Sequence, residues 1–460
     1  MILEFTVGNY RSIAEPQTLS LVAANISGAR EEAVADIGDV KVLRAAAIYG
    51  ANASGKSNIW RALRDFRVLA VRSALDFQEG DELPLEPFLL NVVNEKAPTF
   101  FEMVFRLDKR TLRYGFEASA QRVESEWLFA RTSSRETRLF KRERRDIEVN
   151  KRSFNEGTGK EKLVRDNALF LPVVAQWNGA QSRKIVRFFE RIHTVSGLKE
   201  GYAGYTMRCL LGGKHQEAVA AFLRQLDLSL NDLKLEEISE DQLSLDFPSE
   251  NDEASLDTSL QKRRARATKK MRVQMLHPIY DDEGKTVGQR ALSLARHGSE
   301  GTNKLFSYAG PIIDTLANGD VLCVDELDAR LHPLVTRAII NLFNSADTNP
   351  CNAQLIFNTH DTNLLSPRLL RRDQVWFAEK DRLGKTHLYS LAEFRQSDGQ
   401  LARKDANFEE HYIQGRYGAV PFLGDFSSLM AQEQLACASP AQDAAVDAAE
   451  NMETKVTNHG

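Results

Sequence analysis

The hydrophobic pattern of the first 135 residues predicts several strands. Residues 3–7 alternate between apolar and polar side chains, which is the period-2 pattern of a half-buried strand. Residues 42–49 are almost all apolar and stop at Gly50, as expected for a buried strand that leads into a glycine-containing loop. Further apolar runs between residues 99 and 135 predict antiparallel strands. We therefore expect residues 1–135 to form a first lobe.

The middle of the chain follows another pattern. From residue 160 to residue 235, apolar side chains recur at helical spacing, for example at Ile185 and Phe188. We interpret residues 136–236 as a helical insertion. Residues 237–289 are polar, with an acidic part followed by a basic one, which predicts a charged and partly flexible segment.

Short apolar strands return in the last third of the chain. Residues 321–324 and 355–357 are apolar, and the residues between them follow helical spacing. Strand–helix–strand order predicts a parallel sheet, so we expect residues 290–425 to form a second lobe. Residues 426–460 are rich in Ala, Gln, Asp and Glu, which predicts a disordered tail.

The loop after the second predicted strand carries a phosphate-binding pattern. Residues 50–57 read Gly-Ala-Asn-Ala-Ser-Gly-Lys-Ser, which fits G-x-x-x-x-G-K-[ST]. Between a strand and a helix, the backbone N–H groups of such a Walker A loop surround a triphosphate, and the helix N-terminus faces its charge. Lys56 would reach the β- and γ-phosphates, and Ser57 would bind Mg²⁺. A chance glycine-rich turn is the alternative, and the strand–loop–helix context argues against it. The candidate nucleotide-binding residues of this loop are Gly50, Asn52, Gly55, Lys56 and Ser57.

Two carboxylates follow the apolar strand at 321–324. Asp325 can hold the Mg²⁺ shell, and Glu326 can orient or deprotonate an attacking water. Alone this pattern is weak, because many strands end in acidic residues. Downstream of a phosphate loop it predicts a Walker B motif.

Two further motifs lie in the same region. Ser299 and Gly301 stand where a predicted helix begins, so they can offer a hydroxyl and a backbone N–H to a phosphate. His360 follows the strand at 355–357 and can contact a γ-phosphate. Singly, each is better explained by a structural role, as a small-residue helix cap and as a buried or surface histidine. Their order with the other two motifs favours a nucleotide site.

The order of these motifs resembles that of ATP-binding-cassette (ABC) ATPases of the SMC and OLD type. More narrowly, the chain is similar to the prokaryotic AAA-family ATP/GTP phosphatase group, which includes RloA and abortive-infection ATPases. The segments that carry this resemblance are residues 5–13, 50–57, 325–333 and 411–421.

The resemblance implies an α/β fold, namely a P-loop NTPase of ABC-ATPase (SMC/OLD-like) type with a split head and an inserted helical subdomain. It implies a homodimer or higher homo-oligomer, in which Mg²⁺ with ATP lies between two chains. The loop and the acidic pair of one chain would face Ser299 and Gly301 of the other, with Asp328 in the D-loop nearby. Glu326 and His360 would be catalytic, and Ser57 and Asp325 would hold the Mg²⁺. The signature departs from Leu-Ser-Gly-Gly-Gln at Glu300, no glutamine lid residue is identifiable, and the choice between ATP and GTP stays open.

Composition narrows the class without assigning a function. The chain has 460 residues, 42% of them hydrophobic, and 60 Lys+Arg against 64 Asp+Glu give a net charge of -4. This balance gives no global attraction to nucleic acid or membranes. The four cysteines lie far apart without a CxxC pair, which excludes a cysteine-spaced zinc site and a disulfide framework. No signal-like start or membrane-length apolar run is evident, so we expect a cytoplasmic protein without membrane contact.

Three functional classes remain open at this stage. The first and preferred one is the ATPase switch of an antiphage or abortive-infection system, acting with an effector protein from a neighbouring gene. The second is an SMC-like DNA-maintenance or repair ATPase, and the third is the ATPase subunit of a transporter, which the long insertion and the altered signature disfavour. Nucleic acid could be bound through a basic run made of Lys262, Arg263, Arg264, Arg266, Lys269, Lys270 and Arg272.

Overall fold

A six-stranded sheet contains the parallel strands that the sequence predicts. In the computed structural model its order is β11-β15-β16-β5-β17-β18, and the first five strands are parallel while β18 is antiparallel. Every residue of β5, β15 and β16 is buried, as expected for a parallel sheet covered on both faces. The strands are β5 (Ala45–Tyr49), β11 (Ile192–Ser196), β15 (Val321–Asp325), β16 (Gln354–Asn358), β17 (Val375–Lys380) and β18 (Thr386–Ser390).

The structure describes residues 1–26, 30–132, 135–198, 202–211, 215–226, 233–237, 271–394 and 407–421. All of these except the last residue belong to one compact unit, Met1–Val420. The tail expected at 426–460 lies outside the described residues. So do Lys262, Arg263, Arg264, Arg266, Lys269 and Lys270 of the basic run, whereas Arg272 is described on β13.

The second large sheet is antiparallel and includes the N-terminal strand. Its order is β10-β9-β8-β7-β6-β1-β2. Asp108 lies in the turn between β6 and β7 and has a positive φ of 54°. The strands are β1 (Ile2–Gly8), β2 (Gln17–Ser20), β6 (Thr99–Leu107), β7 (Arg110–Ala118), β8 (Val123–Arg131), β9 (Glu136–Glu143) and β10 (Asp146–Val149).

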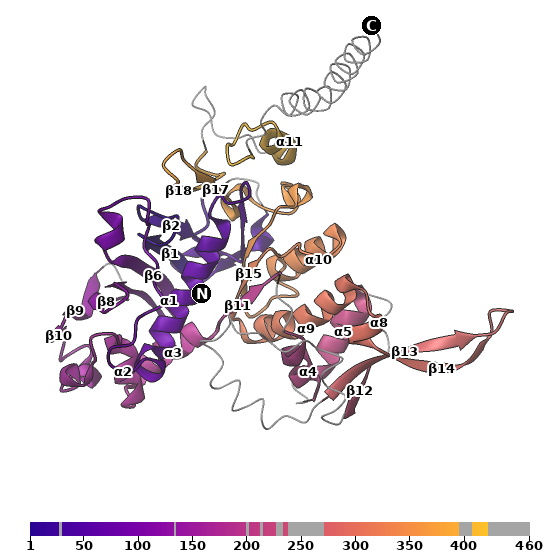
Figure 1. The fold of residues 1–460 in the computed structure, drawn as a ribbon, viewed down its shortest axis with the longest axis horizontal. Coiled ribbons are helices and arrows are strands. Elements are labelled where there is room, and N and C mark those ends of the chain that lie inside the picture. Colours follow the sequence, from indigo (N-terminus) through magenta and orange to yellow (C-terminus); the bar gives the residue numbers. More distant parts are fainter. Residues whose placement is uncertain are drawn as a thin grey trace, which may run out of the picture. The chain divides into compact units, whose positions relative to one another are not determined.

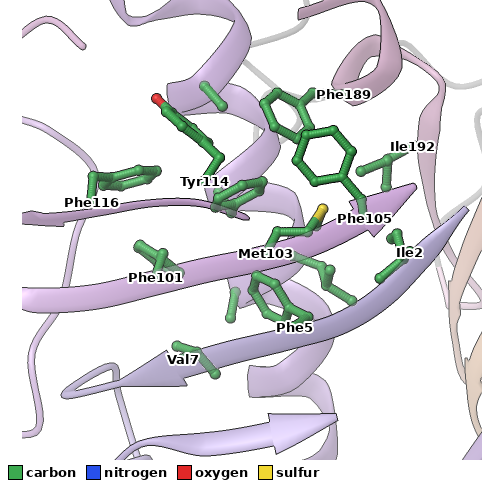
Figure 2. Close-up of a cluster of buried hydrophobic side chains, with 14 of the residues drawn as sticks. Ile2, Phe5, Val7, Phe101, Met103, Phe105, Tyr114, Phe116, Phe189 and Ile192 are labelled. Carbon is green, nitrogen blue, oxygen red and sulfur yellow. The ribbon is translucent and has the colours of Figure 1, made fainter. Parts of the chain in front are cut away.

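One face of the antiparallel sheet forms an aromatic-rich core. Figure 2 shows Phe5, Phe101 and Phe105 from neighbouring strands pointing toward Phe189, which comes from helix α3. The Phe105 and Phe189 ring centroids lie 5.2 Å apart, a favourable edge-on arrangement. Along β6, buried positions alternate with half-buried ones, and this alternation fixes the register of the sheet.

Helix α1 lies between the two large sheets (Figure 1). Its Phe66 packs against Phe5 of the antiparallel sheet, at 5.7 Å between ring centroids, and its Trp60 donates to the Cys323 carbonyl of β15 at 3.1 Å. The helices of the described chain are α1 (Lys56–Asp76), α2 (Phe170–Gln176), α3 (Ala180–Glu190), α4 (Ala203–Leu211), α5 (Gln216–Leu226), α8 (Leu294–His297), α9 (Glu300–Asn318), α10 (Pro333–Asn344) and α11 (Phe408–Ile413). Because α1 begins inside the phosphate-loop motif, both sheets hold that motif in place.

The range 136–236 is not purely helical. The predicted helices are present as α2 to α5, and Ile185 and Phe188 are buried as expected. However, β9 and β10 extend the antiparallel sheet, and β11 forms the edge of the parallel sheet beside β15. Strand β11 is stabilised by pairing with the distant β15, so its own sequence carries little strand signal, whereas β9 and β10 pair with strands next to them in the chain.

Part of the charged range 237–289 forms a regular hairpin. Strands β13 (Met271–Tyr280) and β14 (Thr286–Ser293) pair antiparallel, and Figure 1 shows them as a long ribbon. Strand β12 (Leu233–Glu237) pairs with the other side of β13. Their polar residues face water, which is why composition alone predicted a flexible segment. A small two-stranded sheet consists of β3 (Val34–Asp36) and β4 (Lys41–Leu43).

A buried carboxylate joins the antiparallel sheet to α2. Glu126 on β8 is fully buried and accepts hydrogen bonds from the Tyr114 hydroxyl at 2.9 Å and from the Phe170 and Leu171 N–H groups at 2.5 and 3.0 Å. The buried Arg142 guanidinium lies 3.7 Å away. The carboxylate thus satisfies the free N–H groups where α2 begins.

We predict that Glu126→Ala lowers the free energy of unfolding by about 3–5 kcal/mol, because it leaves two buried N–H groups without their acceptor and the buried Arg142 charge without its counter-ion. The matched control is Glu124→Ala on the same strand. Glu124 is partly exposed and pairs with Arg122 and Arg144, so its loss should cost less than about 1 kcal/mol. Urea unfolding of both variants measures the difference, and equal losses would contradict a structural role for the Glu126 network.

Candidate functional site

The predicted site residues gather at one edge of the parallel sheet. Gly50 directly follows β5, Asp325 ends β15, and His360 lies two residues beyond β16. The carboxyl ends of parallel strands meet at the same edge, and this is where open α/β sheets bind ligands. Residues that are far apart in the sequence therefore share one surface.

The phosphate loop has a backbone that requires its glycines. Gly50 and Gly55 have φ values of 153° and 106°, which side chains rarely adopt. A Cβ atom on Gly50 would lie 2.3 Å from the Ala378 carbonyl oxygen, and one on Gly55 would lie 2.2 Å from Thr386 Oγ1. The loop is thus pressed against the β17–β18 hairpin.

Side chains from both ends of the chain hold this loop. Thr386 Oγ1 donates to the Ser54 carbonyl at 2.9 Å and lies 2.7 Å from Ser12 Oγ. Ser12 in turn accepts from Asn58 Nδ2 at 2.7 Å, in the first turn of α1. The segment 5–13, which carries part of the family resemblance, therefore braces the phosphate loop.

Lys56 and Ser57 occupy the first turn of α1. The buried Lys56 ammonium donates to the carbonyls of Gly50 and Ala51 at 2.8 and 2.9 Å, so it spans the inside of the loop. Ser57 Oγ lies 3.0 Å from Asp325 Oδ1. The side chain of Asn358 donates to the same carboxylate oxygen at 2.7 Å and fixes its orientation.

The charges at this edge influence one another. Burial lowers the pKa of Lys56 to about 8, although Glu326, Asp325 and Asp328 act in the opposite direction. Burial, followed by repulsion from Asp325 and Asp328, raises the pKa of Glu326. Burial and the Lys56 charge lower the pKa of His360, which favours a neutral imidazole. A lysine, three carboxylates and a histidine thus form one electrostatic cluster.

Glu326 is held in a strained conformation. Its φ of 56° is unusual for a residue with a side chain, and such strain persists only where the surroundings impose it. Gly197 after β11 donates its N–H to the Asp325 carbonyl at 2.6 Å, and a Cβ atom at Gly197 would lie 1.9 Å from the Glu326 carbonyl oxygen. The buried Lys304 of α9 donates to the carbonyl of the preceding Ser196 at 3.5 Å. This chain of contacts connects α9 to the acidic pair.

Asp328 and His360 also lie close together. The His360 N–H points to Asp328 Oδ2 at 3.4 Å, and Asp328 Oδ1 is buried with no hydrogen-bond partner among the described residues. Ser54 Oγ is likewise buried without a partner in the described chain. Asn52 lies in the exposed turn of the loop. Polar atoms of this kind are expected where a polar ligand completes a site.

Ser299 and Gly301 form a different local structure. Ser299 caps α9, because its Oγ accepts from the Thr302 N–H at 3.0 Å. A Cβ atom on Gly301 would lie 3.1 Å from the Arg330 carbonyl oxygen. Within the ranges that the structure describes, no hydrogen bond joins either residue to the phosphate loop of the same chain.

Several residues of this site were not predicted from the sequence. Asn358, Thr386, Ser12, Gly197 and Lys304 have no motif of their own, and their roles follow from contacts across the fold. Among these five residues, only Asn358 carries a sequence signal, because it is a polar residue at the end of an apolar strand. In the segment 411–421, Tyr412 stacks on Phe377 at 5.5 Å between ring centroids.

The fold and the loop define a protein of the P-loop NTPase class. Over residues 45–366, more than half of its length, the chain matches the family described as "AAA domain, putative AbiEii toxin, Type IV TA system". The chain belongs to this family of AAA-type, abortive-infection-like ATPases. A comparison with curated proteins gives no significant match. In the described part of the chain, no helix is long and apolar enough to cross a membrane.

The donor set fits the ligand that AAA ATPases generally use, Mg²⁺ with ATP. A hydroxyl oxygen of Ser57 and a carboxylate oxygen of Asp325 stand together, and Mg²⁺ prefers such oxygen ligands alongside phosphate oxygens. The ammonium of Lys56 lies on the inner side of the adjoining loop, where anionic phosphates would be bound.

We predict that Gly55→Ala destabilises the protein more than Gly284→Ala does. Both glycines have positive φ values, but only Gly55 would place its Cβ against Thr386, whereas no atom of the described residues lies within 4 Å of a Cβ at Gly284. We expect a loss of about 1 kcal/mol for Gly284→Ala and at least about 2 kcal/mol for Gly55→Ala. Chemical unfolding measures both, and equal losses would show that the loop is not tightly packed against the hairpin.

Proposed function

We propose that the protein is an ATP-hydrolysing switch of ABC/SMC-like type whose nucleotide site is completed by a second copy of the chain. The observation that carries the proposal is the 3.0 Å contact between Ser57 Oγ and Asp325 Oδ1. It joins the first turn after the phosphate loop to the acidic strand, which is the arrangement needed to hold Mg²⁺ beside a triphosphate.

Each residue then has a defined task. The backbone N–H groups of Gly50 to Gly55 and the Lys56 ammonium bind phosphate oxygens, with Asn52 at the open side of the loop. Ser57 and Asp325 hold Mg²⁺, which when bound offsets the negative charge of the phosphates. The raised pKa of Glu326 brings its carboxylate closer to the range of a general base, so Glu326 orients or deprotonates the attacking water. The neutral His360 contacts the γ-phosphate.

The second copy supplies the residues that the first lacks. Ser299 and Gly301 begin a nineteen-residue helix, α9, whose N-terminus can face an anion. Within the described chain they make no hydrogen bond to their own phosphate loop, so we assign them to the partner's nucleotide. Asp328 accepts from the His360 N–H at 3.4 Å and lies two residues before Arg330, whose carbonyl oxygen approaches Gly301. Asp328 would therefore sense closure of the dimer.

The family places such an ATPase in an abortive-infection context. We therefore assign the chain to an antiphage or abortive-infection type system, in which nucleotide-dependent closure controls a separate effector protein. In this proposal the described residues of 1–135 and 290–425 are the two parts of a split head, and β9, β10 and β11 of the intervening range 136–236 add to its two large sheets. Direct action on DNA stays a secondary hypothesis, because most of the basic run lies outside the described residues.

Mixing two inactive variants tests whether the site is shared. Lys56→Ala disables the loop, and Ser299→Arg blocks the partner-facing helix end. Each heterodimer has one intact site of two, so we expect between about one quarter and one half of wild-type ATPase activity from the mixture and almost none from either variant alone. A mixture that stays inactive, although both variants bind one another, would contradict a shared site.

A second prediction concerns Glu326→Gln. Because the amide cannot accept a proton, this variant should bind ATP and hydrolyse it at least about 100-fold more slowly than wild type. It should remain a dimer in size-exclusion chromatography with ATP, whereas Lys56→Ala should not dimerise with ATP. Full hydrolysis by Glu326→Gln would remove Glu326 from the proposed role.

The lowered pKa of Lys56 predicts how ATP binding depends on pH. With a pKa of about 8, the ammonium of the nucleotide-free protein loses its proton as the pH rises above 8, and the charge that attracts phosphate is lost. The Kd for ATP should therefore rise by up to about tenfold per pH unit above pH 8. Lys56→Ala is the control, and its weak binding should not change over the same range. Constant wild-type affinity from pH 7 to 9.5 would contradict this assignment.

A further inference from the structure

A second cluster of metal-ligating side chains lies at the opposite edge of the parallel sheet. One ligand atom each from His193, Asp314 and Asp320 lie within 4.8 Å of one another. His193 is in the first half of β11, and Asp320 directly precedes β15. The cluster is therefore at the amino ends of these strands, whereas the phosphate site is at their carboxyl ends.

Each carboxylate of the cluster is oriented by a hydrogen-bond donor. Arg191 Nε donates to Asp320 Oδ1, which leaves Asp320 Oδ2 facing His193 Nε2 at 3.0 Å. The Tyr205 hydroxyl donates to Asp314 Oδ2 at 2.6 Å. The Asn318 side chain donates to the other oxygen, Asp314 Oδ1, at 2.9 Å. Hydrogen-bond donors of this kind are the usual outer partners of metal-binding carboxylates.

His215 provides an independent indication of a ligand. It precedes α5 with a φ of 61°, a strained conformation for a residue with a side chain. Its Nε2 lies 3.6 Å from Asp314 Oδ1, beyond hydrogen-bond distance, and is buried with no hydrogen-bond partner among the residues that the structure describes. A buried imidazole nitrogen directed at a carboxylate in this way is expected where a cation lies between them.

The side chains are sufficiently enclosed to make a defined site. The Asp320 and Asp314 side chains are 5% and 13% exposed, and those of His193 and His215 are 28% and 25% exposed. The burial excludes a merely superficial acidic patch, and the partial exposure of both histidines leaves an entry route. Two imidazoles with two carboxylates suit a tetrahedral first-row ion such as Zn²⁺ better than Mg²⁺, which prefers oxygen ligands.

We propose that His193, Asp314 and Asp320, with His215 as the fourth ligand, bind one Zn²⁺ ion. The ion would fasten the α4–α5 pair to the C-terminal part of α9 and to the start of β11. Thr206 of α4 already donates to the Phe306 carbonyl of α9 at 2.8 Å, so the ion reinforces an existing contact. Since Ser299 caps the other end of α9, this site would set the position of the helix that faces the partner's nucleotide.

The test uses the full-length protein after removal of metals with a chelator. Zn²⁺ is titrated in a competition assay with a chromophoric chelator, and thermal unfolding is followed with and without Zn²⁺. The variants are His193→Gln and Asp314→Asn, which keep hydrogen-bonding capacity. The controls are His277→Gln and Cys351→Ser, which remove potential ligands elsewhere.

We expect one Zn²⁺ per chain, a rise in Tm on adding Zn²⁺, and a loss of affinity of at least roughly tenfold in each site variant but in neither control. Mg²⁺ at the same concentration should not reproduce the rise. Absence of Zn²⁺ binding by the wild type, or equal affinity in His193→Gln, would overturn the proposal. A lowered Tm in the variants that is the same with and without Zn²⁺ would also overturn it, because it would assign the cluster to hydrogen bonding alone.

Discussion

The structure depends on bringing Ser57 and Asp325 within hydrogen-bond distance. These residues are 268 positions apart in the sequence, and β16 must be inserted between β5 and β15 before they can meet. The buried parallel sheet supplies that alignment, and α1 is held between this sheet and the antiparallel one. The long intervening chain is therefore compatible with a compact site, because its two ends return to the same edge of one sheet, with only β16 between their strands.

The phosphate loop itself is stabilised from outside. Its glycines accept a close approach of the β17–β18 hairpin, and the Ser12–Thr386 contact joins positions 374 residues apart. On the other side, Gly197 lies against the strained Glu326, and Lys304 of α9 donates to the carbonyl of Ser196. A movement of α9 would therefore reach Asp325 and Glu326 through a short chain of contacts that runs from Lys304 to Ser196 and Gly197.

The sequence predicts the parts of the site that have a local signature. The loop at 50–57, the pair at 325–326 and His360 are recognisable because strand, loop and chemistry are contiguous there. Asn358, Ser12 and the metal-ligating cluster around Asp314 could not be predicted, because their meaning comes from residues brought close by folding. The same reason explains β11, whose five residues become a strand by pairing with the distant β15.

The most direct test of the account is a titration of ATP, with and without Mg²⁺, into wild-type protein and Ser57→Ala. If Ser57 and Asp325 jointly hold Mg²⁺ beside the triphosphate, Mg²⁺ should strengthen ATP binding in the wild type only. Without Mg²⁺, the two proteins should bind ATP with the same Kd. A Ser57→Ala protein that keeps the full Mg²⁺-dependent gain in affinity would contradict the central claim.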